Sequence, residues 1–156
     1  MKFAKTIRFD KSDLNIFPLA SEEGELAVVG TFNFYNLKQQ DLNGKIKQAF
    51  SNGFMGCNTF GYSTFVSLVN ISKEELQQLK IDLGKYLVDN FGAPTKEMAE
   101  KAAKEEINFM LDLCKNHEIG SLLSLTRTWE DKEKFRNLPK ADSCSEQKIW
   151  AFVDEN

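Results

Sequence analysis

Residues 50–71 have the sequence FSNGFMGCNTFGYSTFVSLVNI, which combines three glycines with four of the chain's thirteen phenylalanines. Apolar residues at helical spacing precede Asn52-Gly53, a pair that commonly ends a helix. The segment 62–71 is apolar or small on both faces, which is typical of a central strand. The stretch therefore predicts a helix end, a glycine-rich loop and a well-buried strand in immediate succession.

The pattern on either side of this stretch predicts further strands and helices. Alternation of apolar and polar residues, or short apolar runs, predict strands at 3–9, 14–19, 25–35, 122–130 and 147–153. Apolar stripes predict helices at 41–50, from a capping box at 72–75 to Gly92, and from 95 to about 116, with helical turns at 131–137. We expect an α+β fold in one domain, residues 1–156: a largely antiparallel five- to six-stranded sheet with three to four helices packed mainly on one side.

Composition restricts the function classes. The chain has 156 residues, a net charge of −3 and a pI near 5.3, which disfavours a nucleic-acid-binding protein because those usually concentrate lysine and arginine on one face. Its apolar segments are too short to cross a bilayer, so we expect no membrane partner. Three cysteines without a CxxC pair fit a reducing compartment, and the N-terminal segment lacks a signal-peptide pattern. We expect a cytoplasmic protein.

The glycine-rich loop at 53–61 has two interpretations. It runs from a helix to a strand, so neither the dinucleotide fingerprint nor a phosphate-binding P-loop applies. As a ligand site, the loop would offer backbone amides, aromatic rings and the thiol of Cys57. As a turn, Asn52-Gly53 caps the helix, while Gly56 and Gly61 allow a tight connection into the strand.

Cys57 and the single histidine, His117, are the candidates for nucleophilic or metal chemistry. A nucleophilic Cys57 needs a nearby base or helix N-terminus to lower its pKa, whereas the alternative is a packed free thiol. His117 follows the longest predicted helix, where a positive charge is favourable, and has no metal-binding partner at a recognisable spacing. We therefore predict no catalytic residue, no metal site and no cofactor.

Arg127 is the most informative charged residue, because it shares a strand face with apolar side chains. Such an arginine must be paired or lie at the mouth of a cavity. One interpretation is a site for a small anion, formed by Arg127, Trp129 and Tyr62 with Gly56 and Cys57 of the loop. The alternatives are a salt bridge, or an arginine whose stem covers the sheet edge.

Three short motifs support a family resemblance: TIRFD at 6–10, NGF with FGYSTF at 52–54 and 60–65, and IW at 149–150. Together they resemble an uncharacterised family of small bacterial proteins that carries only a domain-of-unknown-function label. The resemblance implies a compact, single-domain cytosolic protein. It supplies no activity and no catalytic residue.

These observations favour a non-catalytic cytosolic accessory or binding protein that self-associates, with a homodimer as the expected state. The phenylalanine-rich composition leaves apolar surface to cover, which is the basis for the dimer. The alternative is a small-anion-binding protein or enzyme whose pocket is formed by Arg127, Trp129 and the 53–61 loop.

Overall fold

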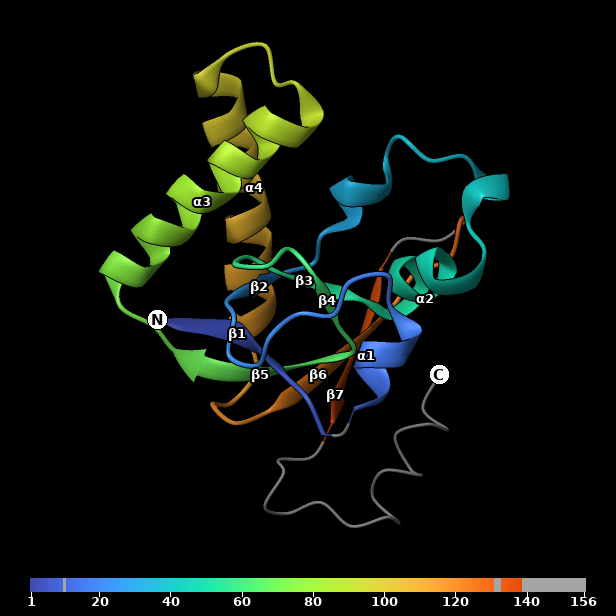
Figure 1. Ribbon diagram of the computed structural model, residues 1–156. Coiled ribbons are helices and arrows are strands. Elements are labelled where there is room, and N and C mark those ends of the chain that lie inside the picture. The colour runs from blue at the N-terminus through green and yellow to red at the C-terminus, as the bar shows by residue number, and fades with distance from the viewer. Residues whose placement is uncertain (10, 131–132, 139–156) are drawn as a thin grey trace.

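The computed structural model describes residues 1–9, 11–130 and 133–138 (Figure 1). Four strands form an antiparallel sheet in the order β1 (Lys2–Ile7), β5 (Phe65–Asn70), β6 (Leu122–Thr126) and β7 (Lys134–Leu138). A second antiparallel sheet contains β2 (Ala27–Val28), β3 (Phe54–Gly56) and β4 (Tyr62–Ser63). The central strand predicted at 62–71 is confirmed for Phe65–Asn70, since β5 pairs with a neighbour on each side, but Tyr62–Ser63 forms β4 of the second sheet.

The helices are α1 (Ser12–Ile16), α2 (Gly44–Asn52), α3 (Lys73–Phe91) and α4 (Lys96–Lys115), with 3₁₀ turns at Thr31–Phe34 and Gln39–Asp41. The predicted capping box is present, since the Ser72 hydroxyl accepts the Glu75 amide and the Glu75 carboxylate accepts the Ser72 amide. The Thr95 hydroxyl caps α4 by accepting the Met98 amide. These local signals set where the two long helices begin.

Helices α3 and α4 form an antiparallel hairpin that extends past the larger sheet (Figure 1). The C-terminal half of α4 packs on that sheet, while the end of α3 and the start of α4 lie beyond it. The core between helices and sheets contains large, fully buried side chains: Phe3, Phe17, Phe54, Met55, Leu68, Leu83, Met110, Leu123 and Leu125. Within the described residues, the outer part of the hairpin therefore projects beyond the larger sheet.

The α+β class and the antiparallel pairing are confirmed, but the single sheet of five to six strands is wrong. The described residues form two sheets, of four and three strands. The strand predicted at 25–35 shrinks to Ala27–Val28, because Gly30 adopts a φ of 79° and turns the chain into a 3₁₀ turn. Phe32 and Phe34 remain buried in that turn, which explains why their alternation resembled a strand.

Two other predicted elements differ, and one lies outside the described residues. The segment 14–19 overlaps helix α1, where the buried Asp13 accepts a hydrogen bond of 2.8 Å from the Thr64 hydroxyl. The helical turns expected at 131–137 are wrong for residues 134–137, which lie in strand β7, whose Phe135 packs near Phe54 and Phe109. Residues 131–132 lie outside the described residues. The strand predicted at 147–153 lies outside the described residues.

Candidate functional site

Arg127 is buried directly after β6, and all five of its guanidinium N–H groups donate to oxygens of this chain. The acceptors and distances are the carbonyls of Phe50 (2.5 Å), Val29 (3.0 Å), Ala49 (3.1 Å) and Gly53 (2.8 Å), and the Thr31 hydroxyl (2.9 Å). Its backbone N–H donates to the Ser51 carbonyl at 2.8 Å. A ligand could bind this guanidinium only after one of these bonds had broken.

The contacts of Arg127 assign it a clear structural role. The last carbonyls of a helix lack some of their partners within the helix. At the end of α2, Arg127 donates to the carbonyls of Phe50 and Gly53, and to the Ala49 carbonyl, which also accepts the Gly53 amide. The rings of Phe34 and Phe50 lie 5.1 and 5.6 Å from its guanidinium carbon. Burial lowers the pKa of Arg127 to about 10, so its positive charge is retained at neutral pH. Arg127 therefore joins α2 to β6.

Two other predicted site residues belong to the same aromatic cluster. Tyr62 is buried, and its ring lies 5.6 Å from that of Phe34. The indole of Trp129 is 45% exposed and lies 6.3 Å from the ring of Phe50. The structure thus brings Arg127, Tyr62 and Trp129 together through Phe34 and Phe50, around packed rings.

Gly56 and Cys57 lie at the opposite end of β3 from Gly53, where the loop closes on a carboxylate of this chain. The buried Glu25 accepts the backbone N–H groups of Asn58 and Thr59 at 2.7 Å each, and the Thr59 hydroxyl at 2.8 Å. A Cβ added to Gly56 would lie 2.7 Å from a Glu25 oxygen. These contacts favour the turn interpretation. Nothing in the sequence pattern distinguished Glu25.

The two described thiols are expected to be unreactive in the folded protein. Both are buried; burial raises the pKa of Cys57, the Glu25 charge raises it further, and burial raises the pKa of Cys114 to about 12. In a Cys144→Ser background, we expect no reaction with a disulfide reagent such as DTNB at pH 8 within minutes, and full reaction after unfolding. Stoichiometric labelling of Cys57 in the folded protein would contradict this.

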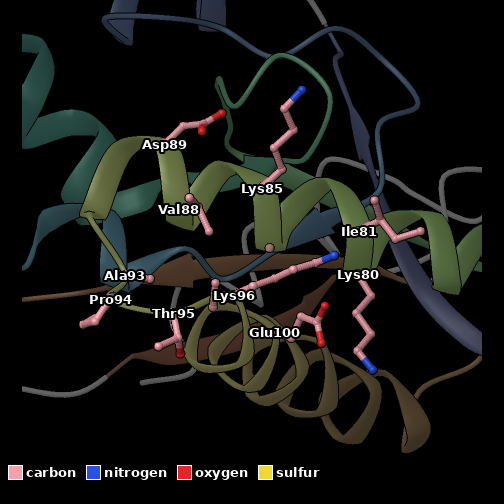
Figure 2. A pocket seen from close by; sticks show the side chains of 12 residues that line it. Lys80, Ile81, Lys85, Val88, Asp89, Ala93, Pro94, Thr95, Lys96 and Glu100 are labelled. Atoms are coloured by element: carbon pink, nitrogen blue, oxygen red, sulfur yellow. The ribbon is translucent and has the colours of Figure 1, made fainter.

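A groove opens on the outer part of the helical hairpin, at a place that the sequence did not single out. This α3–α4 groove has a volume of about 610 Å³, within the range of small-molecule sites (Figure 2). Its lining residues are Lys80, Ile81, Gly84, Lys85, Val88, Asp89, Ala93, Pro94, Thr95, Lys96, Ala99 and Glu100. Half of these are apolar or glycine.

Gly84 gives the groove its depth. A glycine within a helix costs about 1 kcal/mol relative to alanine, which is usually offset by a close packing neighbour. Here a Cβ added to Gly84 would meet no atom within 4 Å. Ile81 and Val88, on the two sides of Gly84, are 54% and 40% exposed. The glycine therefore leaves space between two exposed apolar side chains. Ile81, Gly84 and Val88 lie outside the leucine stripe of α3. Their presence on that helix was the sequence signal from which the groove could have been predicted.

The charges around the groove have both signs. Lys80, Lys85 and Lys96 are the cations, and Asp89 and Glu100 the anions. Within the described part of the chain, the ion pair found within 4.0 Å joins residues elsewhere, on β1 and α3. Figure 2 shows Lys85 and Asp89 on the edge of α3 directed away from α4, whereas Lys96 extends across the space between the helices.

A partly buried carboxyl group, that of Glu106, lies further along α4 than the groove. Burial raises the pKa of Glu106 above its ordinary value and the charge of Glu133 raises it further, while the Gly30 amide and the Arg127 charge lower it. The Glu133 carboxylate accepts a hydrogen bond of 3.0 Å from the Thr31 hydroxyl. The ionised form of Glu106 is therefore less stable in the fold than in water.

This raised pKa predicts the pH dependence of a Glu106→Gln variant. A carboxyl group whose pKa is raised by folding contributes stability that is complete below its unfolded pKa of about 4.3 and is lost as the pH rises through the folded pKa. Glutamine does not ionise. We expect the difference in Tm, variant minus wild type, to increase from pH 4 to pH 8 in thermal unfolding. A constant or decreasing difference would contradict the assignment.

Comparison with known proteins gives one match. The model of a family of unknown function, DUF6505, matches residues 1–152, in agreement with the resemblance drawn from the short motifs. No curated protein and no solved structure matches the chain. Within the described ranges, no helix is long and apolar enough to span a bilayer, and no group of three or more metal-ligating side chains could hold a metal ion. The chain therefore belongs to the family of unknown function DUF6505.

Proposed function

We propose that this is a non-catalytic binding protein that takes a small molecule with an apolar body into the α3–α4 groove. The observation that carries the proposal is the open space at Gly84, between the exposed side chains of Ile81 and Val88. Filling that space would bury apolar surface at roughly 25 cal/mol per Å². A setting in the bacterial cytoplasm, which the family resemblance implies, is part of this proposal.

The geometry of the sequence-predicted residues supports binding over catalysis. The raised pKa keeps the thiol of Cys57 protonated, which is the unreactive form. The anion pocket at Arg127, Trp129 and the 53–61 loop stays a prediction, and it would require Arg127 to release a carbonyl that it now holds. The α3–α4 groove needs no such rearrangement.

The test uses an uncharged apolar dye, Nile red, with the wild-type protein and a Gly84→Leu variant. We expect dye fluorescence to rise with wild type at micromolar concentration and to be lost in the variant, whose leucine fills the groove. Because an added Cβ meets no neighbour and leucine favours helix, the variant is expected to fold with an unchanged or higher Tm.

Lys101→Leu is the matched control, since it adds a leucine to an exposed position of α4 that does not line the groove. Its dye binding is expected to equal that of wild type. Absence of dye binding to wild type, or equal binding to Gly84→Leu, would overturn the proposal.

Self-association, with a second copy as partner, remains a further proposal. Three apolar side chains of the segment 9–19, those of Phe9, Leu14 and Leu19, are about half exposed, at 56%, 49% and 51%. Burial of exposed apolar side chains against a second copy would favour association. Light scattering at micromolar concentration is expected to give about twice the chain mass of 17.8 kDa. A monomer mass across that range would reject the dimer.

A further inference from the structure

We infer that the ligand of the α3–α4 groove is an amphipathic anion, an apolar chain or ring that ends in a carboxylate or similar acid group. This inference rests on the proposed function and adds the chemistry of the ligand. It depends on which charged side chains lie inside the groove and which lie outside it.

Lys96 and Lys80 are the lining lysines that lie on the side of α3 facing α4. Lys96 extends from the start of α4 across the space between the two helices, as Figure 2 shows, and Lys80 lies on the lower edge of α3. Within the described residues, neither ammonium group has a carboxylate within 4.0 Å. A lysine that crosses an apolar groove covers it with its methylene stem and leaves its charge for a partner.

Glu100 is the acid group on the same side of the groove, one helical turn after Lys96. Residues at this spacing are neighbours on a helix surface, so its charge acts on the same space as that of Lys96. Lys80 and Lys96 together outweigh it by one positive charge. The chain as a whole has a net charge of −3, so this local excess of positive charge favours an anion against the general trend.

The apolar part of the groove defines the rest of the ligand. Ile81, Gly84 and Val88 follow one another along α3 at spacings of three and four residues, which places them in a row on one face. Pro94, in the connection between the helices, and Ala99 of α4 also line the groove. A volume of about 610 Å³ accommodates a chain or ring system of moderate size rather than a single ion.

The experiment compares two ligands with the same apolar chain, decanoate and decanol, as competitors for Nile red below their aggregation limits. We expect decanoate to displace the dye from wild type at about fivefold lower concentration than decanol, an advantage that shrinks at high salt. A third competitor, decyl phosphate, distinguishes a phosphate head group from a carboxylate. Whichever of decanoate and decyl phosphate binds more tightly identifies the acid group that the groove prefers.

Three charge variants identify the groups that recognise the anion. Lys96→Gln is expected to remove most of the decanoate advantage, and Glu100→Gln to increase it, because repulsion is lost. Lys101→Gln, at an exposed position of α4 that does not line the groove, is the matched control and is expected to behave as wild type. None of the three changes should alter decanol binding.

The outcomes separate this inference from the proposed function. If Nile red binds and Gly84→Leu abolishes it, but decanoate and decanol compete equally, the groove binds apolar molecules and the anion inference is wrong. If the charge variants leave decanoate binding unchanged, the inference is also wrong. Dye binding that is unaffected by Gly84→Leu would reject the groove itself.

Discussion

Replacement of Arg127 by methionine is expected to lower the free energy of unfolding by on the order of 3–5 kcal/mol. Methionine fills a similar volume but donates no hydrogen bond, so four carbonyl groups lose the Arg127 donor, three of them at the end of α2. The Ala49 carbonyl keeps its bond from the Gly53 amide. Each unsatisfied buried group costs about 1–3 kcal/mol, partly recovered by relaxation. Urea unfolding followed by circular dichroism measures the difference.

One further variant, with a control, shows whether the charge of Arg127 or its number of donors stabilises the fold. Arg127→Lys keeps the positive charge but has three donors in place of five, so we expect an intermediate loss of stability. Lys47→Met, at an exposed position of α2, is the control and should change the unfolding free energy by less than about 0.5 kcal/mol. If Arg127→Met changed the unfolding free energy as little as Lys47→Met, the hydrogen bonds of Arg127 would not hold α2 in place.

Glu25→Ala is the second large effect, with an expected loss of about 2–4 kcal/mol. The carboxylate of Glu25 is buried and accepts the amides of Asn58 and Thr59, the Thr59 hydroxyl and, at 2.6 Å, the amide of Glu22. Alanine removes the acceptor for all four donors. The loss of this acceptor should be visible in hydrogen exchange, because the backbone amides of Asn58 and Thr59 should exchange faster in the variant than in wild type.

Glu25→Gln separates charge from shape in this loop. The amide keeps the size of the side chain but turns one acceptor oxygen into a donor, which then faces another donor, so we expect a loss close to that of alanine. Glu23→Gln is the control, since its exposed carboxylate accepts one hydrogen bond of 3.2 Å. Unchanged exchange at Asn58 and Thr59 in Glu25→Ala would show that the loop does not depend on this carboxylate.

The elements that the sequence predicted are those with local signals. The capping residues Ser72 and Thr95 satisfy backbone donors within one turn, so the start of α3 and of α4 could be predicted from a few neighbouring residues. The strand β5 could be predicted because its run of apolar and small residues, with Val66 and Leu68 buried, is typical of a strand inside a sheet.

The features that the sequence did not predict depend on contacts between distant residues. Gly30 alone converts an alternating strand pattern into a turn, and its backbone angle is not encoded in that alternation. The sequence identified Arg127 as a charge that needed a partner, but not that its partners are carbonyl groups. The groove needs α3 and α4 side by side, so the space at Gly84 is a tertiary property.

The hydrogen bonds of Arg127 also set an order of events during translation. Its acceptors lie 74 to 98 positions earlier in the chain, from Val29 to Gly53. While the ribosome has released only those earlier residues, the carbonyl groups at the end of α2 have no guanidinium to bind them. We therefore expect α2 to fray in nascent chains and to become protected from proteases only after Arg127 has left the exit tunnel.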